Sequence, residues 1–144
     1  MSIRSIVIFL LVACLPATAF SEIARVKKVS GDAHIEREGK RVDAKPGVTL
    51  EQKDVLVTGA NGRLSVTFID NTRFSAGPDS RVSLEKFEFD STTHRGAFES
   101  RVEWGSLAVV SGQIAKEKPD SMKLFTPESI LGVRGTRFIV KVAK

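Results

Sequence analysis

The sequence predicts an all-β fold, and three observations support this prediction. Apolar and polar residues alternate in many short segments, which places the apolar residues on one face of a strand. Turn-forming residues separate these segments at close intervals. No stretch has the apolar spacing of a long amphipathic helix. With 144 residues, the chain has the length of a single domain.

The chain begins with a segment typical of a secretory signal peptide. A short stretch containing Arg4 precedes the apolar residues 6–15, and the small residues 17–19 supply a cleavage site. The apolar run is too short to cross a bilayer as a helix. We therefore expect residues 1–19 to be a signal peptide and residues 20–144 to form one exported β-domain in the periplasm.

A second interpretation of this segment stays open. The sequence Leu-Val-Ala-Cys that ends at Cys14 resembles the lipobox of bacterial lipoproteins. Acylation of Cys14 would make the protein an outer-membrane lipoprotein, and membrane contact is expected only in that case. Cys14 is the one cysteine of the chain, so no internal disulfide can form.

The clearest strands are predicted in the middle of the chain. Alternation marks residues 55–58 and 63–69, and an Asn-Gly pair at 61–62 predicts a hairpin that joins them, because such pairs accept positive φ angles. An Asp-Asn pair at 70–71 would return the chain through residues 72–76.

Two changes of register follow. The apolar residues at 82 and 84 are even-numbered, whereas those at 87 and 89 are odd, and the same change occurs after Trp104. A register change requires a bulge or a corner. Glu85 with Lys86 is expected to carry the first change, and Gly105 the second.

The last part of the chain is expected to hold two further strands, at 122–125 and 137–142. Polar residues at 90–96 and 116–121 predict exposed loops.

Charge does not indicate a polyanion-binding protein. The net charge of +5 becomes +4 once Arg4 is removed with the signal peptide, and the basic residues are scattered singly along the strands. A solvated surface is favoured over nucleic-acid binding, so no nucleic-acid partner is expected.

No residue pattern indicates catalysis. His34 and His94 lack the spacing of metal ligands, the serines lack a nucleophile-elbow pattern, and no glycine-rich loop opens a helix. The sequence therefore predicts a protein that is not an enzyme and that holds no metal and no cofactor.

Trp104 suggests the main alternative function, which is the binding of a ligand other than a protein. If it is exposed beside a basic residue such as Arg101, its ring could stack on a sugar and make the protein a module that binds envelope glycans or other polymers. If it is buried, it belongs to the core.

Four segments in order resemble the FecR-like domain family: GDAHIEREGK, LEQKDVLVTGANGRLSVTFIDNTRFSAGPDSRVSL, VEWGSLAVVSG and FTPESILGVRGTRFIV. The resemblance covers about residues 23–142 and implies a twisted, β-solenoid-like stack of short strands and hairpins. Its motif positions, expected to be structural, are Asp54, Thr58, Asp70, Thr126, Pro127, Gly132, Val133, Arg134, Gly135 and Thr136.

The resemblance also implies a role. The namesake of the family joins a periplasmic domain to a cytoplasmic anti-sigma segment, and this chain has no room for such a segment before its apolar run. The expectation is a non-enzymatic module of the periplasm or cell envelope that binds other envelope proteins and has a sensory or scaffolding role.

Arg134 lies between two glycines of the last motif, and two interpretations are open. The side chain could point inward and pair with Asp54 or Asp70, since a buried guanidinium must be paired. It could instead be exposed and contact an anion or a partner.

Overall fold

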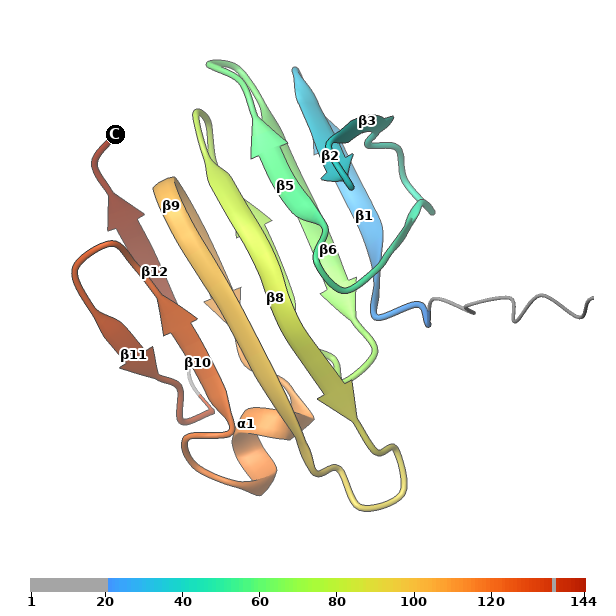
Figure 1. Ribbon diagram of the computed structural model, residues 1–144, viewed down its shortest axis with the longest axis vertical. Coiled ribbons are helices and arrows are strands. Elements are labelled where there is room, and N and C mark those ends of the chain that lie inside the picture. Colours follow the sequence, from blue (N-terminus) through green and yellow to red (C-terminus); the bar gives the residue numbers. More distant parts are fainter. Residues whose placement is uncertain (1–20, 136) are drawn as a thin grey trace, which may run out of the picture.

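The computed structural model describes residues 21–135 and 137–144, which fold into strands with one short helix (Figure 1). The all-β prediction is confirmed. The predicted signal peptide, Cys14 and Thr136 lie outside the described residues. The strands form one continuous curled sheet, in which all pairings are antiparallel except that of β9 with β10.

The curled sheet has two halves that share β9 (Gly96–Val110), and we call them sheet A and sheet B. Sheet A has the order β4 (Thr49–Leu50), β1 (Ala24–Ser30), β6 (Arg63–Phe68), β7 (Arg73–Ala76), β9, β12 (Arg137–Val142). Sheet B has the order β3 (Lys40–Asp43), β2 (Ala33–Arg37), β5 (Val55–Thr58), β8 (Arg81–Phe89), β9, β10 (Met122–Phe125), β11 (Ile130–Gly132).

Strand β9 passes from sheet B to sheet A at Gly105, as the register change predicts. Before this residue β9 pairs with β8, and after it with β7. Gly105 has a φ of +95°, and a Cβ there would lie 2.2 Å from the Ser80 hydroxyl oxygen, so no other residue fits without a shift of the chain. The bulge predicted near Glu85 is also confirmed, because the register of β8 shifts between Leu84 and Lys86.

The inner faces of the two sheets meet in a phenylalanine cluster. Phe68 and Phe74 come from sheet A, and Phe87 and Phe98 come from sheet B. The rings of Phe68 and Phe98 are 4.6 Å apart and those of Phe68 and Phe87 are 5.5 Å apart, measured between centroids. Such contacts between aromatic rings add to the free energy of apolar burial, so the cluster holds the two halves together.

The structure does not confirm the solenoid-like stack that the family resemblance implies. Successive strands pair in antiparallel hairpins or cross between the two sheets, and the halves enclose one core. The backbone therefore follows a curled sheet in this chain.

The predicted hairpin at the Asn-Gly pair is wrong. Strand β5 pairs with β2 and β8, while β6 pairs with β1 and β7, so the turn at 59–62 carries the chain from sheet B to sheet A. Neither Asn61 nor Gly62 has a positive φ. The glycine is needed because a Cβ on Gly62 would lie 1.9 Å from the carbonyl oxygen of Asp32.

One helix was not predicted. Helix α1 (Gln113–Glu117) begins just after β9 and includes the first residues of the loop expected at 116–121. Five residues are too few to show helical periodicity, and the first turn is held by tertiary contacts instead. The amide of Gln113 donates to the Asp70 carbonyl oxygen at 2.8 Å.

Candidate functional site

The candidate site is the edge of the sheet formed by the last two strands, which we call the C-terminal edge. It comprises the turn 126–129, β11 and β12. Among the described residues β11 pairs only with β10, and β12 pairs only with β9. One side of each strand therefore keeps its backbone donors and acceptors available to another chain.

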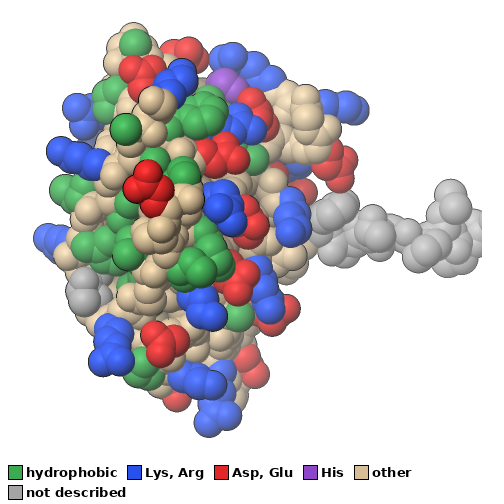
Figure 2. All heavy atoms as spheres, turned by 60° about the vertical axis from the view of Figure 1, so that its left-hand side comes forward, with side chains coloured by type: hydrophobic (Ala, Val, Ile, Leu, Met, Phe, Trp, Pro, Cys, Tyr) green, Lys and Arg blue, Asp and Glu red, His purple; other side chains and the backbone are tan. Residues whose placement is uncertain are grey.

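Large apolar side chains are exposed along the C-terminal edge. Ile130 is 64% exposed, Leu131 37% and Ile139 66%. A groove runs between the turn 126–129 and residues 139–143 of β12 and its end, with Leu131 and Ile139 in its lining. Figure 2 shows hydrophobic side chains gathered over this part of the surface. An edge with exposed apolar side chains is suited to the addition of an extended segment from another protein.

The opposite edge of the sheet is protected. It is formed by β3, whose sequence is Lys-Arg-Val-Asp, and by the two-residue β4. Charged side chains and short length are the usual means by which edge strands avoid pairing with other chains. Strand β11 is also short, with three residues, but it has no charged side chain, since its residues are Ile130, Leu131 and Gly132. The two edges therefore differ in their suitability for binding.

Motif residues build the turn of the C-terminal edge. The Thr126 hydroxyl oxygen accepts a hydrogen bond from the Ser129 amide at 3.0 Å, and the Thr126 amide donates to the Ser129 carbonyl at 2.9 Å. Pro127 occupies the second position of this turn, where its fixed φ is favourable. These contacts hold β10 and β11 together as a hairpin.

The rest of the last motif anchors the edge to the core. Val133 is buried, and its amide donates to the Met122 carbonyl oxygen at 3.0 Å. A Cβ on Gly132 would lie 2.7 Å from a carboxylate oxygen of Asp120, and Gly135 has a φ of +61°. A positive φ is favourable for glycine, so Gly135 lets the chain turn between β11 and β12.

Arg134 is exposed and forms no ion pair with a described residue. The inward interpretation of Arg134 is therefore not supported. Asp54 and Asp70, its suggested partners, are buried and bonded to other groups. The backbone beside Gly135 turns the side chain outward, which the sequence pattern could not indicate.

Asp54 has a structural role at the start of β5. Both of its carboxylate oxygens accept from Arg37, at 2.9 Å from Nε and 2.7 Å from Nη2, and the Glu51 amide donates to one of them at 2.9 Å. This paired geometry with Asp54 raises the pKa of Arg37 above its usual value. The pair fastens the 51–54 turn to β2.

Thr58 and Asp70 fasten two further turns. The Thr58 hydroxyl donates to the Gly77 carbonyl at 2.6 Å and accepts from the Ser80 amide at 2.9 Å. The Asp70 carboxylate accepts from the amide and hydroxyl of Thr72, at 3.0 and 2.8 Å, and from the amide of Ile114 in α1 at 3.3 Å. Such buried side-chain bonds satisfy backbone groups that the turns leave unpaired.

Two members of these networks were not among the predicted site residues. Ser80 is buried, and its hydroxyl bridges to β9 by accepting from the Ser106 amide at 2.9 Å. Thr72 is buried, and its hydroxyl oxygen accepts from the Gly112 amide at 3.1 Å. Both are short polar residues next to turn residues, which is the one sequence signal that could have indicated them.

Trp104 and Arg101 have different neighbours. Trp104 is half-buried, and its ring lies 5.9 Å from the Arg81 guanidinium and 5.3 Å from the Lys144 amine. The Arg101 guanidinium lies 5.3 Å from the Phe125 ring and 3.3 Å from the Glu85 carboxylate. Cations already lie beside the Trp104 ring, which reduces the area open to a sugar.

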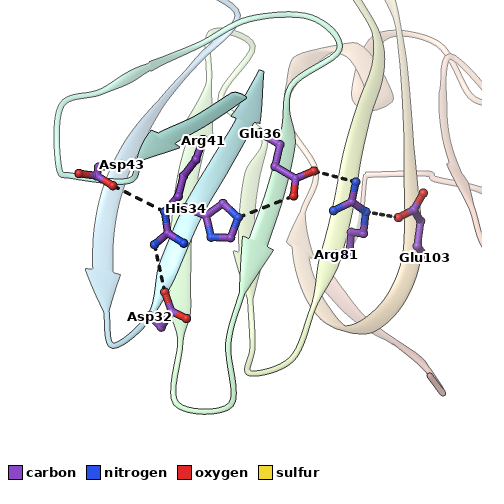
Figure 3. A network of polar contacts seen from close by, with 7 residues as sticks. All are labelled: Asp32, His34, Glu36, Arg41, Asp43, Arg81 and Glu103. Carbon is purple, nitrogen blue, oxygen red and sulfur yellow. Dashed lines mark hydrogen bonds and ion pairs between the residues drawn. The ribbon is translucent and has the colours of Figure 1, made fainter. Parts of the chain in front are cut away.

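Charges on the outer side of sheet B compensate one another (Figure 3). Arg81 lies between two carboxylates, with Nη2 2.8 Å from Glu36 and Nε paired to Glu103. The hydrogen bond from Arg81 lowers the pKa of Glu36 below its usual value. The His34 ring lies on the other side of Glu36, at 3.7 Å. Arg81, Glu36 and Glu103 therefore balance one another's charges, which makes these three residues a poor site for a charged ligand.

Membrane and metal sites were also sought within residues 21–135 and 137–144. In that part of the chain no helix has the length and apolar character needed to cross a bilayer. The same residues contain no group of three or more His, Cys, Asp or Glu side chains placed to hold a metal ion.

Comparison with known protein families gives a match over more than half of the chain. A family model described as FecR protein matches residues 54–144, which includes β5 to β12 and the whole C-terminal edge. No curated protein matches the chain, and no solved structure matches it.

Proposed function

The chain belongs to the FecR protein family, and we propose that it is a non-enzymatic sensory or regulatory domain of the cell envelope that binds another envelope protein through its C-terminal edge. The observation that carries this proposal is the exposure of Ile130, Leu131 and Ile139 beside two strands with unpaired sides. Membership of a family of periplasmic sensory and regulatory domains supports a signalling role.

The chemistry of the edge defines the partner segment. An extended segment can form backbone hydrogen bonds with β11 or β12 and can place alternate side chains in the groove between the turn 126–129 and β12. Those side chains are expected to be apolar, because Leu131 and Ile139 line the groove. Glu128 and Lys141 are the charged residues of the lining and would orient a polar end of the segment.

Arg134 extends the same binding surface. Its exposed guanidinium stands between β11 and β12 in the chain and has no ion-pair partner among the described residues. A carboxylate of the partner protein can therefore pair with it without displacing an internal bond.

The glycan alternative at Trp104 stays a prediction and is not favoured over the C-terminal edge. Arg81 and Lys144 lie beside the ring, and Arg101 is engaged with Glu85 and Phe125.

Site-specific photocrosslinking in the native host tests the proposal. A photoreactive residue in place of Ile130 or Leu131 is expected to give a defined crosslinked product, whereas one in place of Lys40, an exposed residue of the protected edge strand β3, is not. Adding Ile139→Glu should remove the product, because it places a charge in the groove. Equal products from both edges, or no product from the C-terminal edge, would contradict the proposal.

The mature amino terminus decides between periplasmic and lipid-anchored forms. Mass spectrometry of protein from the host is expected to find a chain that begins at Phe20. An acylated Cys14 would instead show an anchored lipoprotein, and the C-terminal edge would then act at the membrane surface.

A further inference from the structure

The outer side of sheet A has a second surface, which we call the cationic face. Three adjoining shallow hollows cover it, and their lining contains five basic residues: Arg63, Arg73, Lys116, Arg137 and Lys141. The hollows are continuous, because neighbouring ones share lining residues such as Arg73 and Ser75. None of the lining residues is an aspartate or a glutamate.

Strand register sets the spacing of these cations. Arg73 of β7 and Arg137 of β12 both lie opposite Val110 of β9, so they stand two strands apart, about 10 Å between their backbones. Lys141 follows Arg137 by four residues along β12, which is about 13 Å. The basic side chains therefore surround an area several strands wide.

Small side chains form the floor between the cations. Ser65, Ser75 and Ala108 lie side by side across β6, β7 and β9, and the Ser65 and Ser75 hydroxyl oxygens are 3.2 Å apart. The larger, exposed Ile139 of β12 lies opposite Ala108 and ends this row. Such residues leave the floor lower than the surrounding lysines and arginines. The hydroxyl groups can donate to and accept from a polar chain that lies in the hollow.

The five cations form no ion pairs with any described residue, whereas Arg25 at the far side of the same sheet pairs with Glu22 at 2.9 Å. In the view of Figure 2, blue and red side chains are interspersed on the right-hand side, whereas the left-hand margin has blue side chains without red ones. Like charges held close together repel, so this face favours an anion.

We propose that the cationic face binds a linear acidic polysaccharide whose sugar rings carry carboxylates. Arginine presents a planar pair of donors that matches a carboxylate. The hollows are open and shallow, which suits a polymer that crosses several strands better than a small molecule. A flat lipid surface would meet the long basic side chains but leave the floor of serines uncontacted, whereas a sugar chain can reach both. The cationic face shares β12 with the C-terminal edge, because Ile139 and Lys141 line both, but this inference rests on the basic residues and not on the binding of a protein segment or on Trp104.

Alginate, a linear polyuronate, is the probe for the test. Isothermal titration calorimetry with the mature chain at low salt is expected to show binding that weakens as salt is added, because the contacts are ionic. The variant Arg63→Gln with Arg73→Gln is expected to bind at least tenfold more weakly. Both residues lie on β6 and β7, away from the C-terminal edge, so this loss is separable from failure of the crosslinking experiment.

A matched control removes two exposed arginines elsewhere. The variant Arg41→Gln with Arg95→Gln loses the same charge and is expected to bind alginate within twofold of the wild type. Unfolding curves of both variants verify that each is folded. Equal binding by the Arg63/Arg73 variant and the wild type would overturn the proposal, as would absence of binding to alginate.

Two further probes distinguish the source of the anion. Polyphosphate and phosphatidylglycerol vesicles carry phosphates in place of carboxylates, and dextran is a neutral polysaccharide. The proposal requires alginate to bind more tightly than all three at the same salt concentration. Tighter binding of polyphosphate or of vesicles would overturn the assignment to an acidic polysaccharide.

Discussion

Both sheets of this domain carry arginines on their outer sides, but the two sets differ in whether they form ion pairs with carboxylates. In sheet B, Arg81 bridges Glu36 and Glu103, and Arg101 pairs with Glu85. In sheet A, Arg63 and Arg73 have no carboxylate partner among the described residues. Both sheets belong to one fold with one core, so the fold does not require either arrangement. The difference indicates that sheet B uses its charges for internal structure, whereas sheet A keeps them available to a ligand.

The largest expected effect comes from the residue at which the two sheets join. Gly105→Ala places a Cβ 2.2 Å from the Ser80 hydroxyl oxygen at a φ of +95°, and we expect a loss of about 3 kcal/mol or more in the free energy of unfolding. Urea unfolding measures it. Gly39→Ala is the control, because Gly39 also has a positive φ but open space around it, and should cost about 1 kcal/mol. Equal losses would show that close packing at the joint is unimportant.

A second prediction concerns the buried charge in sheet B. Asp54→Ala leaves the Arg37 guanidinium without its two shortest bonds, and we expect a loss of about 2 to 4 kcal/mol in the free energy of unfolding. Asp43→Ala is the control, because Asp43 is exposed and lies 3.9 Å from Arg41, and should change the value by less than about 0.5 kcal/mol. If Asp54→Ala unfolds at the same urea concentration as the control, the ion pair between Asp54 and Arg37 does not stabilise the fold.

A third prediction compares the two sheets by one kind of substitution. Arg81→Gln removes the cation between Glu36 and Glu103 and is expected to cost about 0.5 to 1 kcal/mol, since these groups are partly exposed. Arg73→Gln removes a cation that has no ion-pair partner among the described residues, and it is expected to leave the free energy of unfolding unchanged or slightly higher. Thermal or urea unfolding distinguishes them. An equal loss in both variants would mean that the cations of sheet A also have a structural role.

The smallest effect is expected from pH. Arg81 lowers the pKa of Glu36 in the folded protein, so the ion pair stabilises the fold above the unfolded-state pKa of glutamate, about 4.3. This contribution is lost as the pH falls through the lower pKa of the folded state. Arg81→Gln should therefore reduce the slope of stability against pH over roughly pH 5 to 3. If the slope of stability against pH is identical in wild type and variant, the ion pair between Arg81 and Glu36 does not contribute to stability.

Local patterns predicted much of the fold because alternation and turn residues act over a few positions. The bulge at Glu85 and the corner at Gly105 followed from the change between even and odd apolar positions, since a strand cannot change its buried face without an irregularity. The prediction of a hairpin at Asn61 was wrong because the glycine beside it is required by a contact with a distant residue and not by a local turn. The pair Asn-Gly suits a tight hairpin, but close approach to Asp32 explains the glycine here.

The candidate site was predicted only in outline. The FecR motif residues were identified by resemblance, and Asp54, Thr58 and Asp70 have structural bonds. The exposure of Arg134 and the groove beside Ile139 could not be read from the motif, because they depend on how the backbone turns beside Gly135 and on which strand lies opposite.

The sequence by itself determined the β class, the two register changes, the family and the absence of internal disulfides, because each of these depends on residue types and their local spacing. The tertiary structure decided which edge is open and which charges are paired. Arg63, Arg73 and Arg137 appear as single, scattered charges along the chain, and they come together only because β6, β7 and β12 lie in one sheet around β9. Strand order and register, which contacts between distant segments set, decide whether an exposed arginine meets a carboxylate or another arginine.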